Sequence, residues 1–170
     1  HLLRRQMLRN YRKPLINLSP KSLLRFPAAS SSLEEITKGA FREALEDKTI
    51  SDPNSVSKVI LSSGKVFYDL IEERTKRKIS NVALVRVEQL YPFPDEEISK
   101  ILNQYKNAKE FVWTQEEPKN QGAWGFVENR LNSLIGKKGK FRYTGRGESP
   151  SPAVGQVKIH LKELSEFLNE

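Results

Sequence analysis

From about residue 56 onward, short apolar runs alternate with longer stretches in which apolar residues recur at helical spacing. The apolar runs lie at 59–61, 82–85, 111–113 and 141–143, and the stretches with helical spacing follow at 66–78, 95–105, 126–135 and 157–168. Because the runs are apolar at successive positions, they predict strands that are buried on both faces. Strands that alternate with helices predict a mainly parallel sheet with helices on both faces.

A fifth strand is predicted earlier, at 15–18, where an apolar run lies between Pro14 and Pro20. We therefore expect an α/β fold with a mainly parallel five-stranded sheet. Residues 1–10 predict the end of a helix. Residues 27–57 predict an irregular connector with one helical turn from Leu33, capped by a preceding serine.

The length of 170 residues is typical of a single domain, which we expect to span 1–170. The chain begins with His1 rather than Met, so we expect it to be a fragment of a larger chain.

Composition excludes several classes of site. The sequence has no cysteine, which excludes disulfides and thiolate catalysis, and its two histidines, His1 and His160, are too far apart in sequence to predict a metal site. We interpret His160 as a partly buried structural histidine. There is no apolar run of about 18 residues, so no membrane-spanning helix is predicted. The net charge of +8 favours an acidic partner, but aromatic residues are not interleaved with the basic clusters, so we expect no nucleic-acid binding.

Polar residues follow the predicted strands, where the loops of a parallel sheet gather at one edge and form a ligand crevice. Loops 62–65 and 115–123 each lead into a predicted helix, whose free N–H groups attract anions. Gly64 and Gly122 would let a ligand approach the backbone closely, while Lys21 and Lys65 add positive charge. Arg5 could add a further positive charge. The alternative for 62–65 is an ordinary capped helix start, because the full phosphate-loop pattern is missing.

Other charged residues are open to two interpretations. Glu116 and Glu117 are adjacent, so on an extended segment they point in opposite directions and do not form an acid–base pair. They could instead make a subunit contact or an ion pair with Lys119. Arg146 could recognise a carboxylate or phosphate, or simply hold the final loop in place. We find no complete set of catalytic residues, and the chain therefore looks like a binding or assembly domain.

Several motifs, in collinear order over nearly the whole chain, resemble the C-terminal domain of the first, decarboxylating component of 2-oxoglutarate dehydrogenase. They are HLLRRQ at 1–6, RKPLI at 12–16, SPKSLLR at 19–25, SGKVFY at 63–68, RVEQLYPFP at 86–94, QEEPKNQG at 115–122, GR at 145–146, SPAVG at 151–155 and HL at 160–161. Each motif alone is weak, but together they are specific. The chain also resembles the first component of 2-oxoadipate dehydrogenase, particularly at 1–25, so the resemblance leaves the substrate open.

The resemblance implies a fold similar to the transketolase C-terminal domain, which helps to build a homodimer. It implies that the whole enzyme, an oxidoreductase of the tricarboxylic acid cycle, decarboxylates 2-oxoglutarate with thiamine diphosphate and Mg²⁺. The succinyl group then passes to a lipoyl group on the second component of the multienzyme complex. Cofactor, metal and catalytic histidines would belong to preceding domains, so we expect none of their binding residues here, and the fragment alone would be inactive. The enzyme would be cytoplasmic in a bacterium and lie in the mitochondrial matrix of a eukaryote.

Some members of the resembled family bind regulatory acetyl-CoA at this domain. The matching positions here are Arg5, Lys21, Ser62, Lys65, Gln115, Gly122 and Ala123. They coincide with the loops chosen on physical grounds, and so we expect an acetyl-CoA or nucleotide-like effector there.

Two other classes of function remain as alternatives. An independent anion- or nucleotide-binding module with a flavodoxin-like sheet would have no thiamine diphosphate domain before it. A basic nucleic-acid-binding domain would show an affinity that falls steeply with salt. We expect neither nucleic acid nor membrane as a partner.

Overall fold

The computed structural model describes residues 1–169, and these divide into two compact units, His1–Arg42 and the part from Glu43 onward. The first unit holds the helices α1 (Leu2–Leu8) and α2 (Leu33–Lys38) and the short 3₁₀ turns η1 (Lys21–Leu23) and η2 (Pro27–Ala29). The predicted helical turn from Leu33 is confirmed as α2. The Ser32 hydroxyl accepts a hydrogen bond from the backbone N–H of Glu35 at 3.1 Å, and the Glu35 side chain completes a capping box.

The predicted strand at 15–18 is wrong. These residues form neither helix nor strand, and the side chains of Ile16 and Leu18 are 83% and 94% exposed. An apolar run becomes a strand only where a neighbouring chain supplies ladder hydrogen bonds, and no described residue pairs with this one.

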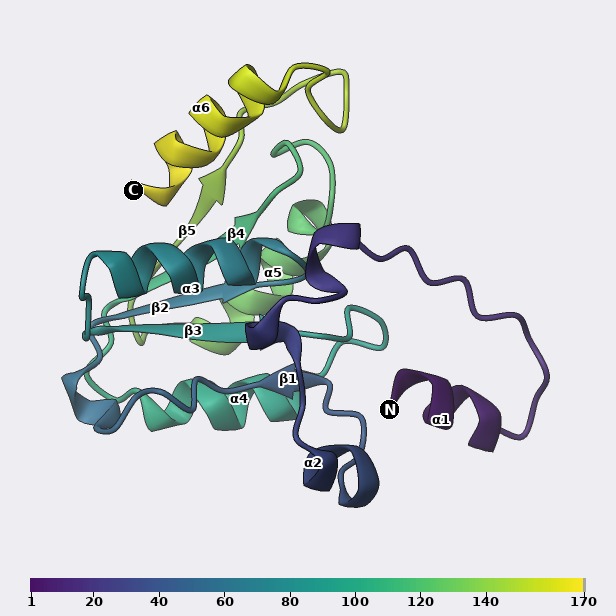
Figure 1. Cartoon of the computed structure of the whole chain (residues 1–170). Coiled ribbons are helices and arrows are strands. Elements are labelled where there is room, and N and C mark those ends of the chain that lie inside the picture. Colours follow the sequence, from purple (N-terminus) through teal and green to yellow (C-terminus); the bar gives the residue numbers. More distant parts are fainter. Residues whose placement is uncertain (170) are drawn as a thin grey trace. The chain divides into compact units, whose positions relative to one another are not determined.

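The second unit is built on a five-stranded sheet in the order β1-β3-β2-β4-β5 (Figure 1). Its strands are β1 (Ala44–Leu45), β2 (Lys58–Ser62), β3 (Val82–Val87), β4 (Glu110–Gln115) and β5 (Lys140–Gly145). Neighbouring strands run parallel, except that β1 is antiparallel to β3. The predicted fold class is therefore confirmed, with one change of strand. The fifth strand is β1, which lies inside the predicted connector 27–57 together with α2 and the 3₁₀ turn η3 (Pro53–Ser55).

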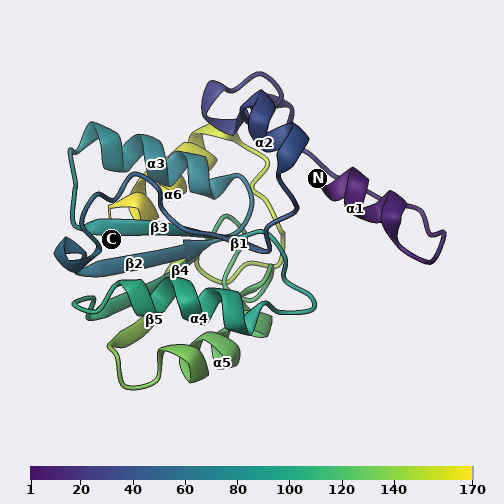
Figure 2. The ribbon, with the colours of Figure 1, turned by 90° about the horizontal axis from the view of Figure 1, so that it is seen from below.

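Four helices cover the two faces of this sheet, with α3 (Val66–Lys76) and α6 (Val157–Leu168) on one face and α4 (Asp95–Gln104) and α5 (Trp124–Ile135) on the other (Figure 2). Most of the core lies between the sheet and the α4–α5 pair. It includes Leu61 and Trp113, which are in register on adjacent strands and fully buried. At the carboxyl ends of these strands, the side chains on the other face of the sheet are polar. Ser62 is in register with Thr114, and Thr114 is in register with Thr144. The sheet therefore has an apolar face and a face that becomes polar at its carboxyl edge.

The short strand β1 is followed by a carboxylate that continues its ladder. Oδ2 of Asp47 accepts a hydrogen bond from the backbone N–H of Leu84 at 2.9 Å, and the same carboxylate pairs with Arg74 of α3. Both side chains are nearly buried, at 5% and 11% exposure. Asp47 thus ties the connector to the sheet and to α3.

The strand order fixes where a ligand crevice can form. The chain passes from β2 to β3 on one side and then crosses to β4 on the other side of β2. Loops that leave the carboxyl ends of β2 and β4 therefore diverge, and this divergence opens a crevice in doubly wound sheets.

Candidate functional site

A cavity of about 370 Å³ lies at this divergence, at the carboxyl edge of the sheet. Its walls come from the loops after three adjacent strands: Ser63 and Gly64 after β2, Leu90 and Tyr91 after β3, and Gln115, Glu117, Gly122 and Ala123 at the end of β4 and beyond. Trp113 and Phe126 close the apolar side. Three of the predicted ligand residues, Gln115, Gly122 and Ala123, therefore share one cavity.

Gln115 organises the post-β4 loop, because its buried carboxamide is fully engaged within the protein. Oε1 accepts hydrogen bonds from the backbone N–H of Trp124 at 2.9 Å and from the indole N–H of Trp113 at 3.0 Å. Nε2 donates to the carbonyl oxygens of Gln121 and Pro118 at 2.7 and 3.1 Å. The carboxamide thereby caps the first turn of α5, whose own N-cap residue, Ala123, has no side chain that could do so. Gln115 sets the shape of the cavity rim.

Gly64 and Gly122 both have left-handed backbones, with φ of 79° and 64°. At Gly64 a Cβ would find no heavy atom within 4 Å, so this part of the rim is open to an approaching ligand. The space beside Gly122 is instead filled by protein. Gly64 therefore leaves open space at the rim, whereas Gly122 makes room for neighbouring protein atoms.

Ser62 and Lys65 lie beside the cavity rather than on its described walls. Ser62 was expected in the loop, but it is the last residue of β2 and is 1% exposed. Within residues 1–169, neither the Ser62 hydroxyl nor that of its register partner Thr114 has a hydrogen-bond partner. Buried hydroxyl groups are nearly always satisfied, so this pair is an exception inside the carboxyl edge of the sheet.

Lys65 is the N-cap residue of α3, and its ammonium group is held by two carboxylates. Nζ lies 2.9 Å from Oδ2 of Asp69 and 3.6 Å from Oε1 of Glu116. Burial lowers the pKa of Lys65, but the hydrogen bond and charge of Asp69, followed by those of Glu116, raise it above its ordinary value overall. The cation is therefore secure at neutral pH. The predicted alternative of an ion pair for the glutamates is realised by Glu116 with Lys65 rather than with Lys119.

Arg5 and Lys21 belong to the first unit. The guanidinium carbon of Arg5 lies 3.7 Å from the centroid of the Phe41 ring, a cation–π contact, and Lys21 begins η1 with an exposed side chain. Their part in a ligand site stays a prediction.

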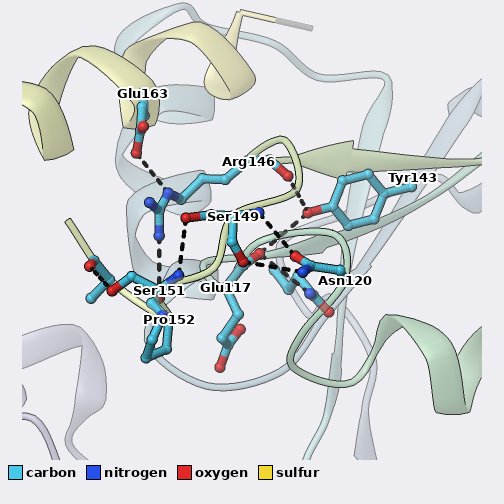
Figure 3. A network of polar contacts seen from close by, with 10 residues as sticks. Glu117, Asn120, Tyr143, Arg146, Ser149, Ser151, Pro152 and Glu163 are labelled. Atoms are coloured by element: carbon cyan, nitrogen blue, oxygen red, sulfur yellow. Dashed lines mark hydrogen bonds and ion pairs between the residues drawn. The ribbon is translucent and has the colours of Figure 1, made fainter.

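A network of polar contacts joins the post-β4 loop to the loop after β5 (Figure 3). Asn120 donates from Nδ2 to the carbonyl oxygen of Ser149 and accepts from its N–H, both at 3.1 Å. The hydroxyl of Tyr143 donates to the carbonyl of Arg146 at 3.0 Å. Burial, together with the charge of Glu117, raises the pKa of Tyr143 to about 12, so this hydroxyl remains a donor. The loop that carries Gly122 is thus fastened on the side away from Lys65.

Arg146 holds the final loop in place, which was one of its two predicted roles. Its guanidinium is buried, and Nε donates to Glu163 of α6 at 2.6 Å while another nitrogen donates to the carbonyl of Pro152 at 3.2 Å. Sequence reasoning missed Asn120, Ser149 and Glu163 as parts of this network. The polar loop composition around Asn120 was visible, but nothing in the sequence links it to Ser149, 29 positions away.

The described residues offer neither a metal-ligand set nor a membrane span. Among residues 1–169, no three His, Cys, Asp or Glu side chains are grouped in a way that could hold a metal ion. Likewise, no helix in that part of the chain is long and apolar enough to cross a membrane.

Comparison with known proteins identifies the family of this chain. Residues 30–170 match the model of the family described as 2-oxoglutarate dehydrogenase C-terminal. The chain is 46% identical over 170 residues to a 2-oxoglutarate dehydrogenase E1 component of Haemophilus influenzae and 48% identical over 172 residues to that of Rickettsia conorii. It is 43% identical over 168 residues to an oxoglutarate dehydrogenase of Buchnera aphidicola. These alignments cover 99–100% of this chain but 18% of the length of each relative. The chain therefore belongs to the 2-oxoglutarate dehydrogenase C-terminal family.

Proposed function

We propose that this chain is the C-terminal assembly and regulatory domain of a 2-oxoglutarate dehydrogenase E1 component. The whole enzyme would decarboxylate 2-oxoglutarate and transfer the succinyl group to a lipoyl group of the second component. The observation that carries the proposal is the family match over residues 30–170, together with relatives of the same name over the whole chain. The mainly parallel sheet of the second unit is consistent with the transketolase C-terminal fold that was expected.

Catalysis in this proposal belongs to parts of the enzyme outside these residues. Thiamine diphosphate and Mg²⁺ would supply the decarboxylation chemistry, and the domains before this one would bind them. The proposal assigns no step of the reaction to residues 1–169. Their contribution would be the E1 homodimer, contact with the lipoyl-bearing component, and effector binding. The location would be the cytoplasm of a bacterium or the mitochondrial matrix of a eukaryote.

Activity of the full-length protein tests the enzymatic part. With thiamine diphosphate, Mg²⁺ and a lipoyl-bearing second component, we expect turnover of 2-oxoglutarate with a higher kcat/KM than for 2-oxoadipate. A reversed preference would identify the 2-oxoadipate enzyme instead. Turnover of neither substrate would contradict the proposal.

We also propose that the cavity at the carboxyl edge is part of an effector site for a phosphorylated nucleotide such as acetyl-CoA. Two features support it: the open approach at Gly64 and the helix N-terminus of α3 with the Lys65 cation. Free N–H groups and a fixed cation both stabilise a phosphate group. The apolar wall formed by Trp113 and Phe126 suits the uncharged part of such a ligand.

Thermal stability of the full-length protein measures effector binding. Millimolar acetyl-CoA should raise the Tm of the wild type, and this rise should shrink in Lys65→Ala. A wild type with no shift would contradict the site.

A further inference from the structure

The ion pair between Lys65 and Glu116 joins two of the loops that line the cavity. Lys65 follows Gly64 of the post-β2 loop, and Glu116 lies between Gln115 and Glu117 of the post-β4 loop; Gly64, Gln115 and Glu117 all line the cavity. The 3.6 Å contact between Nζ of Lys65 and Oε1 of Glu116 therefore ties the rim together at the N-terminus of α3.

Of the two carboxylates on Lys65, Glu116 is the one that a ligand can displace. Asp69 lies one turn along the same helix, at 2.9 Å, and its side chain is 23% exposed. Glu116 comes from a separate loop, lies farther away at 3.6 Å, and is 38% exposed. Longer and more exposed ion pairs are weaker, because water screens them. If Glu116 moved away, Asp69 would still hold the ammonium group at the helix end.

We propose that Glu116 is an internal competitor for Lys65 and thereby sets the affinity of the effector site for anions. This inference rests on the proposed effector site. A phosphate oxygen and the Glu116 carboxylate are like charges that approach the same cation, so anion binding works against the contact between Lys65 and Glu116. Removing the carboxylate should therefore tighten binding, and the gain should depend on Lys65.

Glu117 provides a matched control for the effect of charge. It is the next residue of the same loop, carries the same charge and lines the cavity, but Glu116 rather than Glu117 pairs with Lys65. A general gain from removing negative charge near an anionic ligand would appear equally in both variants. A gain that comes from freeing Lys65 would be larger for Glu116.

The experiment is calorimetric titration of acetyl-CoA into the full-length protein, in five forms: wild type, Glu116→Gln, Glu117→Gln, Lys65→Ala and the double variant Lys65→Ala/Glu116→Gln. We expect Glu116→Gln to lower Kd by about two- to fivefold, the range set by an exposed ion pair. Glu117→Gln should change Kd by less. In the Lys65→Ala background, Glu116→Gln should give no gain.

Two results would overturn the inference, and they are distinguishable. Equal gains in the two glutamine variants, or a gain that persists without Lys65, would show a general charge effect while leaving the effector site intact. An absence of binding in all five forms would reject the effector site and this inference with it.

Discussion

A Cβ atom on residue 122 would lie 2.8 Å from Nε2 of Gln115, so the absence of a side chain at Gly122 is what allows the Gln115 carboxamide to occupy its place. Gly122 also has a left-handed backbone, with φ of 64°. The two residues form one structural unit: the glutamine holds the loop carbonyls and caps α5, and the glycine leaves it room. The missing side chain at Gly122 is therefore used for packing within the protein.

Gly122→Ala should destabilise the protein by about 1–3 kcal/mol, because it adds strain at a positive φ and a clash with a saturated buried amide. Urea unfolding followed by tryptophan fluorescence measures this loss. Gly64→Ala is the matched control: its φ is 79° but a Cβ there meets no atom within 4 Å, so only the backbone strain of about 1 kcal/mol is expected. Equal losses in the two variants would contradict the packing argument.

Gln115→Ala should cost about 2–4 kcal/mol, because it leaves two buried donors without partners, the indole N–H of Trp113 and the backbone N–H of Trp124. We expect a lower urea midpoint and faster amide exchange in the first turn of α5. Asn120→Ala is a suitable comparison, since its contacts to Ser149 are exposed and its loss should be smaller. Exchange in α5 that stays at the wild-type rate would show that Gln115 does not cap the helix.

Glu163→Ala should loosen α6, because it leaves the guanidinium of Arg146 buried and without its carboxylate. The carboxylate is partly exposed, which lowers the expected loss to about 1–3 kcal/mol. Limited proteolysis near residues 150–160 and urea unfolding report it. Glu166→Ala removes only the exposed pair with Lys162 and should change stability by less than about 0.5 kcal/mol. If both variants are equally mild, Arg146 does not anchor the helix.

Acid should weaken the attachment of the connector at Asp47. Burial raises the pKa of Asp47, but hydrogen bonds from Arg74, Thr49 and Leu84 together lower it below its ordinary value of 3.8. Because the folded-state pKa is depressed, the stabilisation is present above the unfolded pKa and is lost as pH falls through the folded-state value. The urea midpoint should therefore fall as the pH drops below about 4.

Asp47→Asn tests which group is responsible. It should be less stable than the wild type at pH 7 and lose less stability on acidification, since its side chain has no proton to gain. Wild type and variant with the same pH dependence would assign the acid sensitivity to other carboxylates, such as Glu110, whose pKa is also lowered despite burial.

The sequence predicted the parallel strands and their helices well, because uninterrupted apolar runs and helical spacing are local signals. It failed at β1, where two residues suffice for a strand because β3 supplies the partner. The opposite error occurred at 15–18, where an apolar run has no partner in the described structure. Pairing is a long-range property, and a single sequence does not reveal it.

In the candidate site, too, local features were predicted and long-range contacts were not. Gln115, Gly122 and Ala123, which the sequence places at the end of a strand and in the loop after it, line one cavity. Side-chain roles were harder to predict: the carboxamide of Gln115 is used internally, Ser62 ends a strand, and Glu116 reaches Lys65, 51 positions before it in the sequence. Such contacts depend on which strands become neighbours, and this information lies in the order β3-β2-β4 rather than in any motif.

The carboxylate of Asp47 makes the two edges of the sheet different in their hydrogen bonding. On the β3 side, β1 covers the last two residues of the strand and Asp47 takes the N–H of Leu84, so a foreign strand finds its first hydrogen-bonding positions occupied. On the β5 side, β4 is the strand partner and, among residues 1–169, no further strand lies beyond. Protected margins of this kind prevent uncontrolled edge-to-edge association. The sheet is therefore protected against pairing with a second copy on the β3 side.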